Sequence, residues 1–149
     1  MISIKNITKK FGDNKVIDSL SLEIKKGSIT IIKGNSGIGK TTFFRILLGL
    51  TPYDEGVIKG LPNKISALFQ EDRLIENLSV KKNIYLALKE KENNSLNEKI
   101  IKNLEAVGLY NIENKKASKL SQGMKRRVSF IRTMMKESDL IAFDEPFRS

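Results

Sequence analysis

The nine residues "GNSGIGKTT" at positions 34–42 decide how the chain is interpreted. They fit the pattern G-x-x-x-x-G-K-[ST], in which glycines let the main chain turn tightly and direct successive N–H groups at phosphate oxygens. In this pattern the lysine reaches the terminal phosphates, and the hydroxyl that follows it ligates Mg²⁺. The apolar run at 28–33 predicts a buried strand before the loop, and "KTTFFRILLGL" at 40–50 predicts a helix after it. The sequence therefore predicts a phosphate-binding loop between a strand and a helix rather than an ordinary turn.

The remaining elements are predicted from hydrophobic periodicity. Alternating apolar and polar residues predict half-buried strands at 2–7 and 20–24, around a turn at 12–15. Apolar runs predict core strands at 64–69 and 139–145, and helical spacing predicts helices at 80–88, 96–108 and 120–136. Core strands that alternate with helices favour an α/β fold with a mostly parallel sheet. The two N-terminal strands predict an additional antiparallel layer.

The composition restricts both the chemistry and the location. The chain has 149 residues and contains no cysteine, which excludes a disulfide scaffold. It also contains no histidine, so a general base would have to be a carboxylate, a lysine or a tyrosine. A net charge of +10 allows a nucleic-acid or anionic-membrane partner, but the scattered lysines favour ordinary solvated surface charge. The N-terminus lacks the apolar core of a signal peptide, and no apolar run approaches the ~20 residues that span a bilayer. We therefore expect a cytoplasmic protein, or one that docks on a membrane through a partner.

Two acidic residues follow the apolar run at 140–143. Asp144 and Glu145 are predicted to emerge at the carboxyl end of a strand, where open parallel sheets bind their ligands. One carboxylate can hold magnesium, and the next can orient or deprotonate an attacking water. An acidic residue at the end of a strand is common, so the pair alone is a weak signal. Together with the glycine loop, it is the expected counterpart in a nucleotide site.

Short motifs in a fixed order resemble those of ATP-binding cassette (ABC) ATPases. The loop at 34–42 resembles the Walker A motif, "LFQED" at 68–72 the Q-loop, "LSQGM" at 120–124 the signature motif, and "LIAFDEP" at 140–146 the Walker B strand. "KKFGD" places Phe11 where the family stacks the adenine ring. The resemblance covers the whole chain, and "LFQEDRLIENLSVKKNI" is most similar to nitrate/sulfonate/taurine-type importer ATPases.

The resemblance implies a fold and a domain organisation. It implies a P-loop NTPase with a mostly parallel RecA-like core sheet, an N-terminal antiparallel layer and a small helical subdomain at about 71–135 within a single domain, 1–149. The chain stops after "DEPFRS", where the family continues into further core strands. We therefore expect an incomplete cassette without the C-terminal part of the fold, which binds ATP better than it hydrolyses it.

The resemblance also implies roles for individual residues. Phe11 would stack on adenine, and the rest of the ATP-binding set would be Gly34, Asn35, Ser36, Gly37, Ile38, Gly39, Lys40, Thr41 and Thr42. Mg²⁺ would be held by Thr41, Gln70 and Asp144. Gln70 would sense the metal and the water, and Glu145 would be the general base. The alternatives are that Phe11 is a core aromatic at a strand end and that Gln70 is a solvated strand terminus.

The signature motif implies a second subunit. Ser121, Gln122 and Gly123 would reach the γ-phosphate of ATP held mainly by a second ABC subunit in a head-to-tail dimer. Gly123 permits close approach, and the helix N-terminus after it suits an anion. The usual family motif is LSGGQ, so Gln122 and Met124 depart from it, and Gln122 is expected to weaken the phosphate contact in trans.

The sequence is consistent with three functions. The chain could be the ATPase subunit of a membrane transporter, a soluble ABC protein that acts on nucleic acid, or a remnant that binds nucleotide without hydrolysing it. The interval between Gln70 and Leu120 holds short helical stretches without sustained heptads, which favours the transporter. That function implies transmembrane permease partners, a peripheral position on the cytoplasmic face of the membrane, and no direct contact with nucleic acid.

Overall fold

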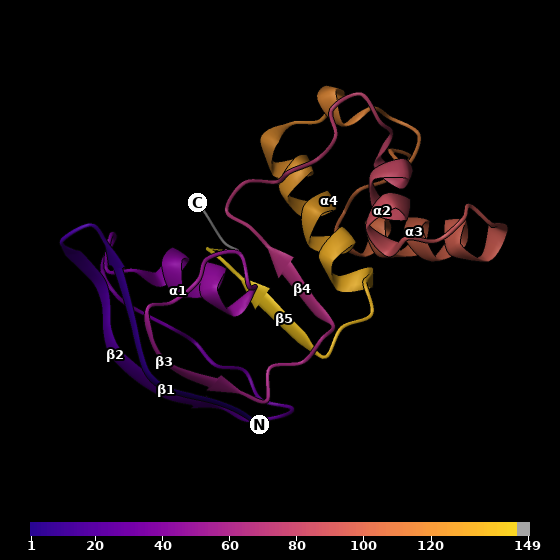
Figure 1. The fold of residues 1–149 in the computed structure, drawn as a ribbon. Helices are drawn as coiled ribbons and strands as arrows, with labels where there is room; N and C mark the ends of the chain where they lie inside the picture. Colours follow the sequence, from indigo (N-terminus) through magenta and orange to yellow (C-terminus); the bar gives the residue numbers. More distant parts are fainter. Residues whose placement is uncertain (146–149) are drawn as a thin grey trace. The chain divides into compact units, whose positions relative to one another are not determined.

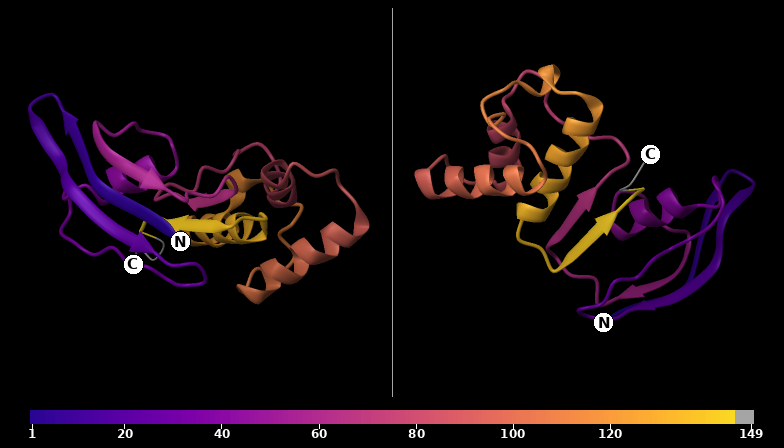
Figure 2. Two further views of the ribbon diagram at one scale, coloured as in Figure 1. Left: turned by 60° about the horizontal axis from the view of Figure 1, so that its bottom comes forward. Right: turned by 180° about the vertical axis from the view of Figure 1, so that it is seen from behind.

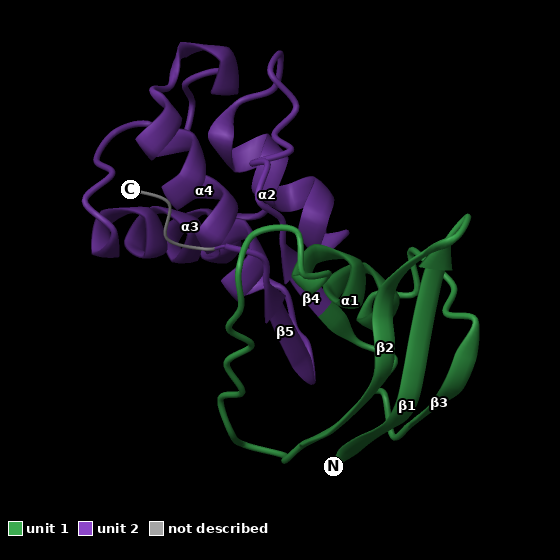
Figure 3. Ribbon diagram, turned by 90° about the vertical axis from the view of Figure 1, so that its left-hand side faces the viewer, with its two compact units in different colours: residues 1–65 green, residues 66–149 purple. Residues whose placement is uncertain are grey.

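The computed structural model describes residues 1–145, which divide into two compact units, the first over 1–65 and the second from Ser66 onward (Figure 3). An antiparallel sheet and one helix form the first unit, and the longer helices belong to the second. Within the described part of the chain, no helix combines the length and the apolar character needed to cross a bilayer.

The first unit is built on a three-stranded antiparallel sheet (Figure 1). Its strands are β1 (Ile2–Phe11), β2 (Asn14–Ile24) and β3 (Glu55–Lys59), in the order β2-β1-β3. Ile2, Ile4 and Ile7 of β1 are buried. Ile2 and Ile4 follow the alternation of a half-buried strand, and an irregularity in the pairing with β2 between Ile4 and Ile7 shifts the pattern by one residue. The predicted antiparallel N-terminal layer is confirmed.

Helix α1 (Lys40–Leu47) also belongs to the first unit. It buries Phe43, Phe44, Ile46 and Leu47, which gives the helix one apolar side. The chain leaves the helix at Gly49, where φ is 68° and the N–H of Leu50 donates to the carbonyl of Arg45 at 2.9 Å. Glycine is favoured at this left-handed position after a helix. The predicted helix from Lys40 is therefore confirmed.

The second unit contains the helices α2 (Val80–Leu88), α3 (Asn94–Ala106) and α4 (Gln122–Met135), with a short 3₁₀ turn, η1 (Ala117–Lys119). Side chains of Ser79, Asn93 and Ser121 cap the three α-helices by accepting a first-turn N–H. The helices share one apolar core, whose buried residues are Val80, Ile84, Tyr85, Leu96, Ile100, Leu104, Leu109, Ile112, Leu120, Val128 and Ile131.

Strands β4 (Ile65–Leu68) and β5 (Leu140–Phe143) pair with each other. Figures 1 and 2 show the two arrows side by side and pointing in the same direction, so the pair is parallel. The main-chain N–H of Asp144 donates to the carbonyl of Leu68 at 2.9 Å and extends the pairing by one residue. The carboxyl ends of the two strands therefore meet at one edge.

Two features of the first unit differ from the prediction. Residues 28–33 form no strand, and Ile29 and Ile31 are 91% and 71% exposed. The prediction of a buried strand there is wrong, because a strand needs a hydrogen-bonded neighbour and no other described segment pairs with these residues. Strand β3 was not predicted, since its five residues "EGVIK" carry little alternation.

Candidate functional site

The glycine loop turns sharply immediately before α1. Gly37 and Gly39 have φ values of 81° and 98°, which side chains other than glycine rarely adopt. A Cβ on Gly39 would lie 2.8 Å from the carbonyl oxygen of Val16, so that glycine is also required by its close contact with β2. The loop is thus shaped by its own backbone and by the sheet.

Lys40 folds back over the loop that precedes it. Its Nζ donates to the carbonyl oxygens of Gly34 and Asn35 at 2.8 and 2.7 Å. These two main-chain acceptors hold the ammonium over the loop. A phosphate oxygen that enters the loop would therefore meet a positive charge that is already in place.

The N-terminus of α1 favours an anion. Gly39 is the N-cap, no side chain caps the helix, and no acidic residue lies in its first turn. The first N–H groups of a helix lack intrahelical partners and carry the positive end of its dipole. With Lys40 and the hydroxyls of Thr41 and Thr42 beside them, these donors fit the phosphates of a nucleotide.

Phe11 ends strand β1 next to the turn at Gly12 and is 53% exposed. It is therefore not a core aromatic, which was the structural alternative for this residue. The ammonium of Lys9 lies 5.2 Å from the centroid of the Phe11 ring. An exposed ring with a cation on one face is a suitable platform for a flat ligand.

In the second unit, Gln70 and the acidic pair come together at the ends of β4 and β5. Asp144 is buried, and Glu145 follows it in an exposed position with a φ of 47°. The amide Nε2 of Gln70 donates to Oε2 of Glu145 at 3.3 Å. Hydroxyl, amide and carboxylate oxygens are the donors that Mg²⁺ prefers. Of the predicted set, Gln70 and Asp144 offer such oxygens in the second unit, and Thr41 offers a hydroxyl in the first unit.

Arg126 of α4 contacts this edge and was not predicted from the sequence. Its Nη1 donates to the carbonyl of Gln70 at 3.2 Å and also to the carbonyl of Phe69, while its Nη2 donates to the carbonyl of Glu145 at 2.8 Å. One guanidinium therefore ties the Q-loop to the residue after Asp144.

Two more residues of α4 bind the Q-loop main chain. Ser129 Oγ and Arg132 Nη2 donate to the carbonyl of Asp72 at 2.7 and 2.8 Å, and Arg132 Nη1 donates to the carbonyl of Arg73 at 2.8 Å. Burial lowers the pKa of the Arg132 guanidinium, and the Asp72 carboxylate partly offsets this. Arginine stays charged in proteins, so these contacts are charge-assisted.

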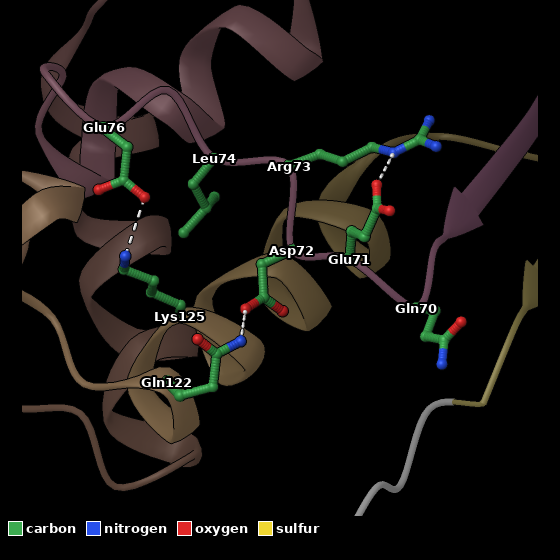
Figure 4. A pocket seen from close by; sticks show the side chains of 8 residues that line it. All are labelled: Gln70, Glu71, Asp72, Arg73, Leu74, Glu76, Gln122 and Lys125. Atoms are coloured by element: carbon green, nitrogen blue, oxygen red, sulfur yellow. Dashed lines mark hydrogen bonds and ion pairs between the residues drawn. The ribbon is translucent and has the colours of Figure 1, made fainter.

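The signature residues begin α4. Ser121 is the N-cap, and its Oγ accepts the N–H of Met124 at 3.3 Å. Gly123 is open, because a Cβ there would meet nothing within 4 Å. The side chain of Gln122 binds another residue of the same chain: its Nε2 donates to the carboxylate of Asp72 at 2.8 Å (Figure 4).

A pocket of about 500 Å³ lies between the Q-loop and the start of α4 (Figure 4). Across it, Lys125 Nζ pairs with Glu76 at 2.8 Å. The lining residues are Gln70, Glu71, Asp72, Arg73, Leu74, Glu76, Gln122 and Lys125. The pocket is therefore lined mainly by polar and charged side chains.

Comparisons with known proteins agree with these motifs. A family model described as "ABC transporter" matches residues 17–148. The spermidine/putrescine import ATP-binding protein PotA of Acetivibrio thermocellus is 35% identical to the chain, over 98% of the chain and 45% of PotA. The aliphatic sulfonates import ATP-binding protein SsuB 1 of Pseudomonas fluorescens is 36% identical, over 98% of the chain and 55% of that protein.

Solved structures give the same result. An ATP-binding cassette in a dimeric, post-hydrolysis state with ADP and phosphate bound superimposes with a TM-score of 0.82 at 27% identity, over 98% of this chain and 74% of that one. This supports the predicted α/β fold. The chain spans about half the length of the curated relatives it matches.

Proposed function

The chain belongs to the ABC transporter family of ATP-binding proteins, and we propose that it forms the nucleotide-binding part of a transporter ATPase. In this proposal it binds ATP with Mg²⁺, and the complete protein hydrolyses the ATP to drive a solute through partner permease subunits.

One observation carries the proposal. Lys40 is held over the glycine loop by the carbonyls of Gly34 and Asn35, at the N-terminus of a helix that has no side-chain cap. A positive charge, the first N–H groups of a helix and neighbouring hydroxyls are the groups that bind polyphosphate. We assign the phosphates to this loop and its first helical turn, and the base to Phe11.

We propose that Gln70, Asp144 and Glu145 of the second unit act in hydrolysis together with Thr41 of the first unit. We assign Glu145 as the general base, Gln70 as the residue that senses the reacting water, and Thr41, Gln70 and Asp144 as the holders of Mg²⁺. Bound magnesium supplies neutralisation of phosphate charge. The contact between Gln70 Nε2 and Glu145 Oε2 supports this assignment, since it joins two residues expected to act on the same water.

A second ABC subunit completes the proposed site. Ser121 and Gly123 would face the γ-phosphate of the ATP held by that subunit in a head-to-tail dimer. The open surroundings of Gly123 support this role. ATP would then favour the closed dimer, and hydrolysis would release it.

The transport role rests on the relatives. Those reported above are named for the import of polyamines and sulfonates. We propose a cytoplasmic, membrane-peripheral subunit whose permease partners choose the solute.

Calorimetry with Mg-ATP tests the phosphate site. Lys40→Ala is expected to weaken ATP binding by at least tenfold, because a charge-assisted contact of about 1.5–3 kcal/mol is lost. Lys15→Ala removes the same charge from an exposed position on the β1–β2 hairpin and is the matched control. Equal affinities for the wild type and Lys40→Ala would refute the assignment of this loop.

Hydrolysis is tested separately in the complete protein. Glu145→Gln is expected to retain ATP binding, abolish turnover and accumulate an ATP-bound dimer in size-exclusion chromatography. Normal turnover by this variant would exclude Glu145 as the base and leave the phosphate site unaffected.

A further inference from the structure

We propose that Lys9 is a positioning residue for the nucleotide base: held by Asp54, its ammonium covers one face of the Phe11 ring and leaves the other face for a purine. The inference rests on the proposed function, since it requires Phe11 to lie at the ATP site. It adds two residues, Lys9 and Asp54, for which no role was predicted from the sequence.

Lys9 is unusual because it is buried, with 7% of its surface exposed. Lysine is almost never fully buried unless it is paired. Its partner is Asp54, whose Oδ1 lies 3.1 Å from the Lys9 Nζ. The position of this ammonium is therefore set by one carboxylate.

Asp54 is itself fixed by the main chain. Its second carboxylate oxygen, Oδ2, accepts the N–H of Lys10 at 2.6 Å, and its own N–H donates to the carbonyl of Thr8 at 2.9 Å. Both partners belong to β1, the strand that carries Lys9 and Phe11. The anchor therefore has a rigid attachment to the same strand as the ring.

The ring of Phe11 receives this fixed charge on one side. The Lys9 ammonium lies 5.2 Å from the ring centroid, within the range of a cation–π contact. Phe11 nevertheless remains 53% exposed. A cation on one face also draws electron density from the ring, which favours an electron-rich purine on the other face.

Lys9 and Phe11 lie close to the part of β2 that contacts the glycine loop. Lys9 pairs with Ile17 of β2, and the Phe11 ring centroid lies 5.2 Å from the Lys9 Nζ. A Cβ on Gly39 would lie 3.1 Å from Cγ1 of Val16 and 3.2 Å from Cγ1 of Ile17. The loop thus abuts the cross-strand partner of Lys9, and Phe11 is about 7 Å further along the strand.

This arrangement separates the base from the phosphates. Lys9 would act through the ring and so affect only ligands with a base, whereas Lys40 would affect every polyphosphate. Stacking on an aromatic ring tolerates different bases, so the effect should be similar for ATP and GTP.

The test compares Mg-ATP with inorganic tripolyphosphate, which has no base, by calorimetry on the full chain. Lys9→Met is expected to weaken ATP binding by about fivefold to tenfold, the size of a partly desolvated cation–π contact. Tripolyphosphate affinity is expected to stay within about twofold. Lys9→Arg should restore ATP affinity, since Arg keeps both the charge and the pairing with Asp54. Lys15→Met controls for the loss of one charge.

A double-mutant cycle with Phe11→Ala identifies the pathway. If Lys9 acts through the ring, Lys9→Met has no further effect on ATP affinity once Phe11 is removed. Asp54→Asn keeps Lys9 but loosens its anchor, and is expected to reduce ATP affinity without affecting tripolyphosphate. This variant tests the same idea if Lys9→Met does not fold.

The outcomes are distinguishable. Equal losses for ATP and tripolyphosphate in Lys9→Met, or unchanged ATP affinity in both Lys9→Met and Asp54→Asn, would overturn the proposal. If Phe11→Ala leaves ATP binding unchanged, the base does not use this ring and the proposal fails, while tripolyphosphate binding still supports the phosphate site. If the wild type binds neither ligand, the proposed function itself fails.

Discussion

Gln122 and Asp72, 50 residues apart in the chain, are joined by a 2.8 Å hydrogen bond from the amide of the first to the carboxylate of the second. Asp72 is buried, and its other carboxylate oxygen lies 3.6 Å from Nη1 of Arg126. The Asp72 carboxylate therefore contacts two residues of α4, in addition to the bonds that this helix makes to main-chain carbonyls of the Q-loop. Gln122 departs from the glycine usual in the family, and the structure gives that side chain an intrachain partner.

We expect Gln122→Ala to lower the free energy of unfolding by about 1.5–3 kcal/mol, because a buried carboxylate loses a hydrogen bond. Urea unfolding followed by circular dichroism measures this change. Lys125→Ala is the matched control on the same turn of α4, since its partner Glu76 is 54% exposed. An exposed ion pair contributes about 0–1 kcal/mol, so a larger loss for Lys125→Ala than for Gln122→Ala would contradict the expectation.

Gly39→Ala is expected to reduce both stability and ATP affinity. An alanine at this position would have to adopt a φ of 98°, and its Cβ would lie 2.8 Å from the carbonyl oxygen of Val16. Gly12→Ala is the control, because φ is 58° there but the space around a Cβ is open. That variant should lose only about 1–2 kcal/mol of stability from the left-handed backbone and bind ATP normally. Thermal unfolding and calorimetry would separate the two effects.

Asn83 is expected to be among the most sensitive polar residues of the second unit. Its Oδ1 accepts the N–H of Ile75 at 2.7 Å, and its Nδ2 donates to the carbonyls of Ile75 and Ser79, both at 3.1 Å. Asn83→Ala would leave these partly buried groups unpaired, at a cost of roughly 2–4 kcal/mol in unfolding free energy. The exposed Asn114, changed to Ala, should alter stability by less than about 0.5 kcal/mol. Similar costs for the two variants would show that the Asn83 bonds contribute little.

The Asp54 carboxyl is expected to titrate below its ordinary value of 3.8, because the Lys10 N–H and then the Lys9 ammonium lower its pKa. A carboxylate with a lowered pKa in the folded state stabilises the protein above the unfolded-state pKa. That contribution is lost as the pH falls through the folded-state pKa. Carbon-detected NMR titration should show the Asp54 midpoint rising in Lys9→Met, yet staying below 3.8 because the Lys10 N–H remains. Lys15→Met should leave the midpoint unchanged, and an unchanged midpoint in Lys9→Met would exclude the ion pair as a cause.

Elements set by local signals could be predicted from the sequence. The helix from Lys40 and the helix at 122–135 each show their apolar periodicity within one short stretch, and Gly49 marks the end of the first. Local signals could not decide whether residues 28–33 form a strand. The apolar residues of this segment show only that a strand there would be buried, and pairing depends on a neighbour elsewhere in the chain.

In the candidate site, too, contacts between residues close in the sequence could be predicted, and contacts between distant residues could not. The contact of Lys40 with Gly34 and Asn35 joins residues at most six positions apart, so the loop could be recognised from its own letters. The contacts of Arg126 with Gln70 and Glu145 span 56 and 19 residues. No local pattern indicates them, because they arise only when α4 packs beside the ends of β4 and β5.

The way α4 binds the Q-loop also affects how the protein tolerates change. Arg126, Ser129 and Arg132 donate to carbonyl oxygens of the loop, which every amino acid possesses. The path of the loop is therefore set by the helix, while a side chain such as that of Glu71, which is 81% exposed, contributes little to it. Substitutions at Glu71 should therefore leave the path of the loop unchanged, because the contacts that set it are made to main-chain oxygens.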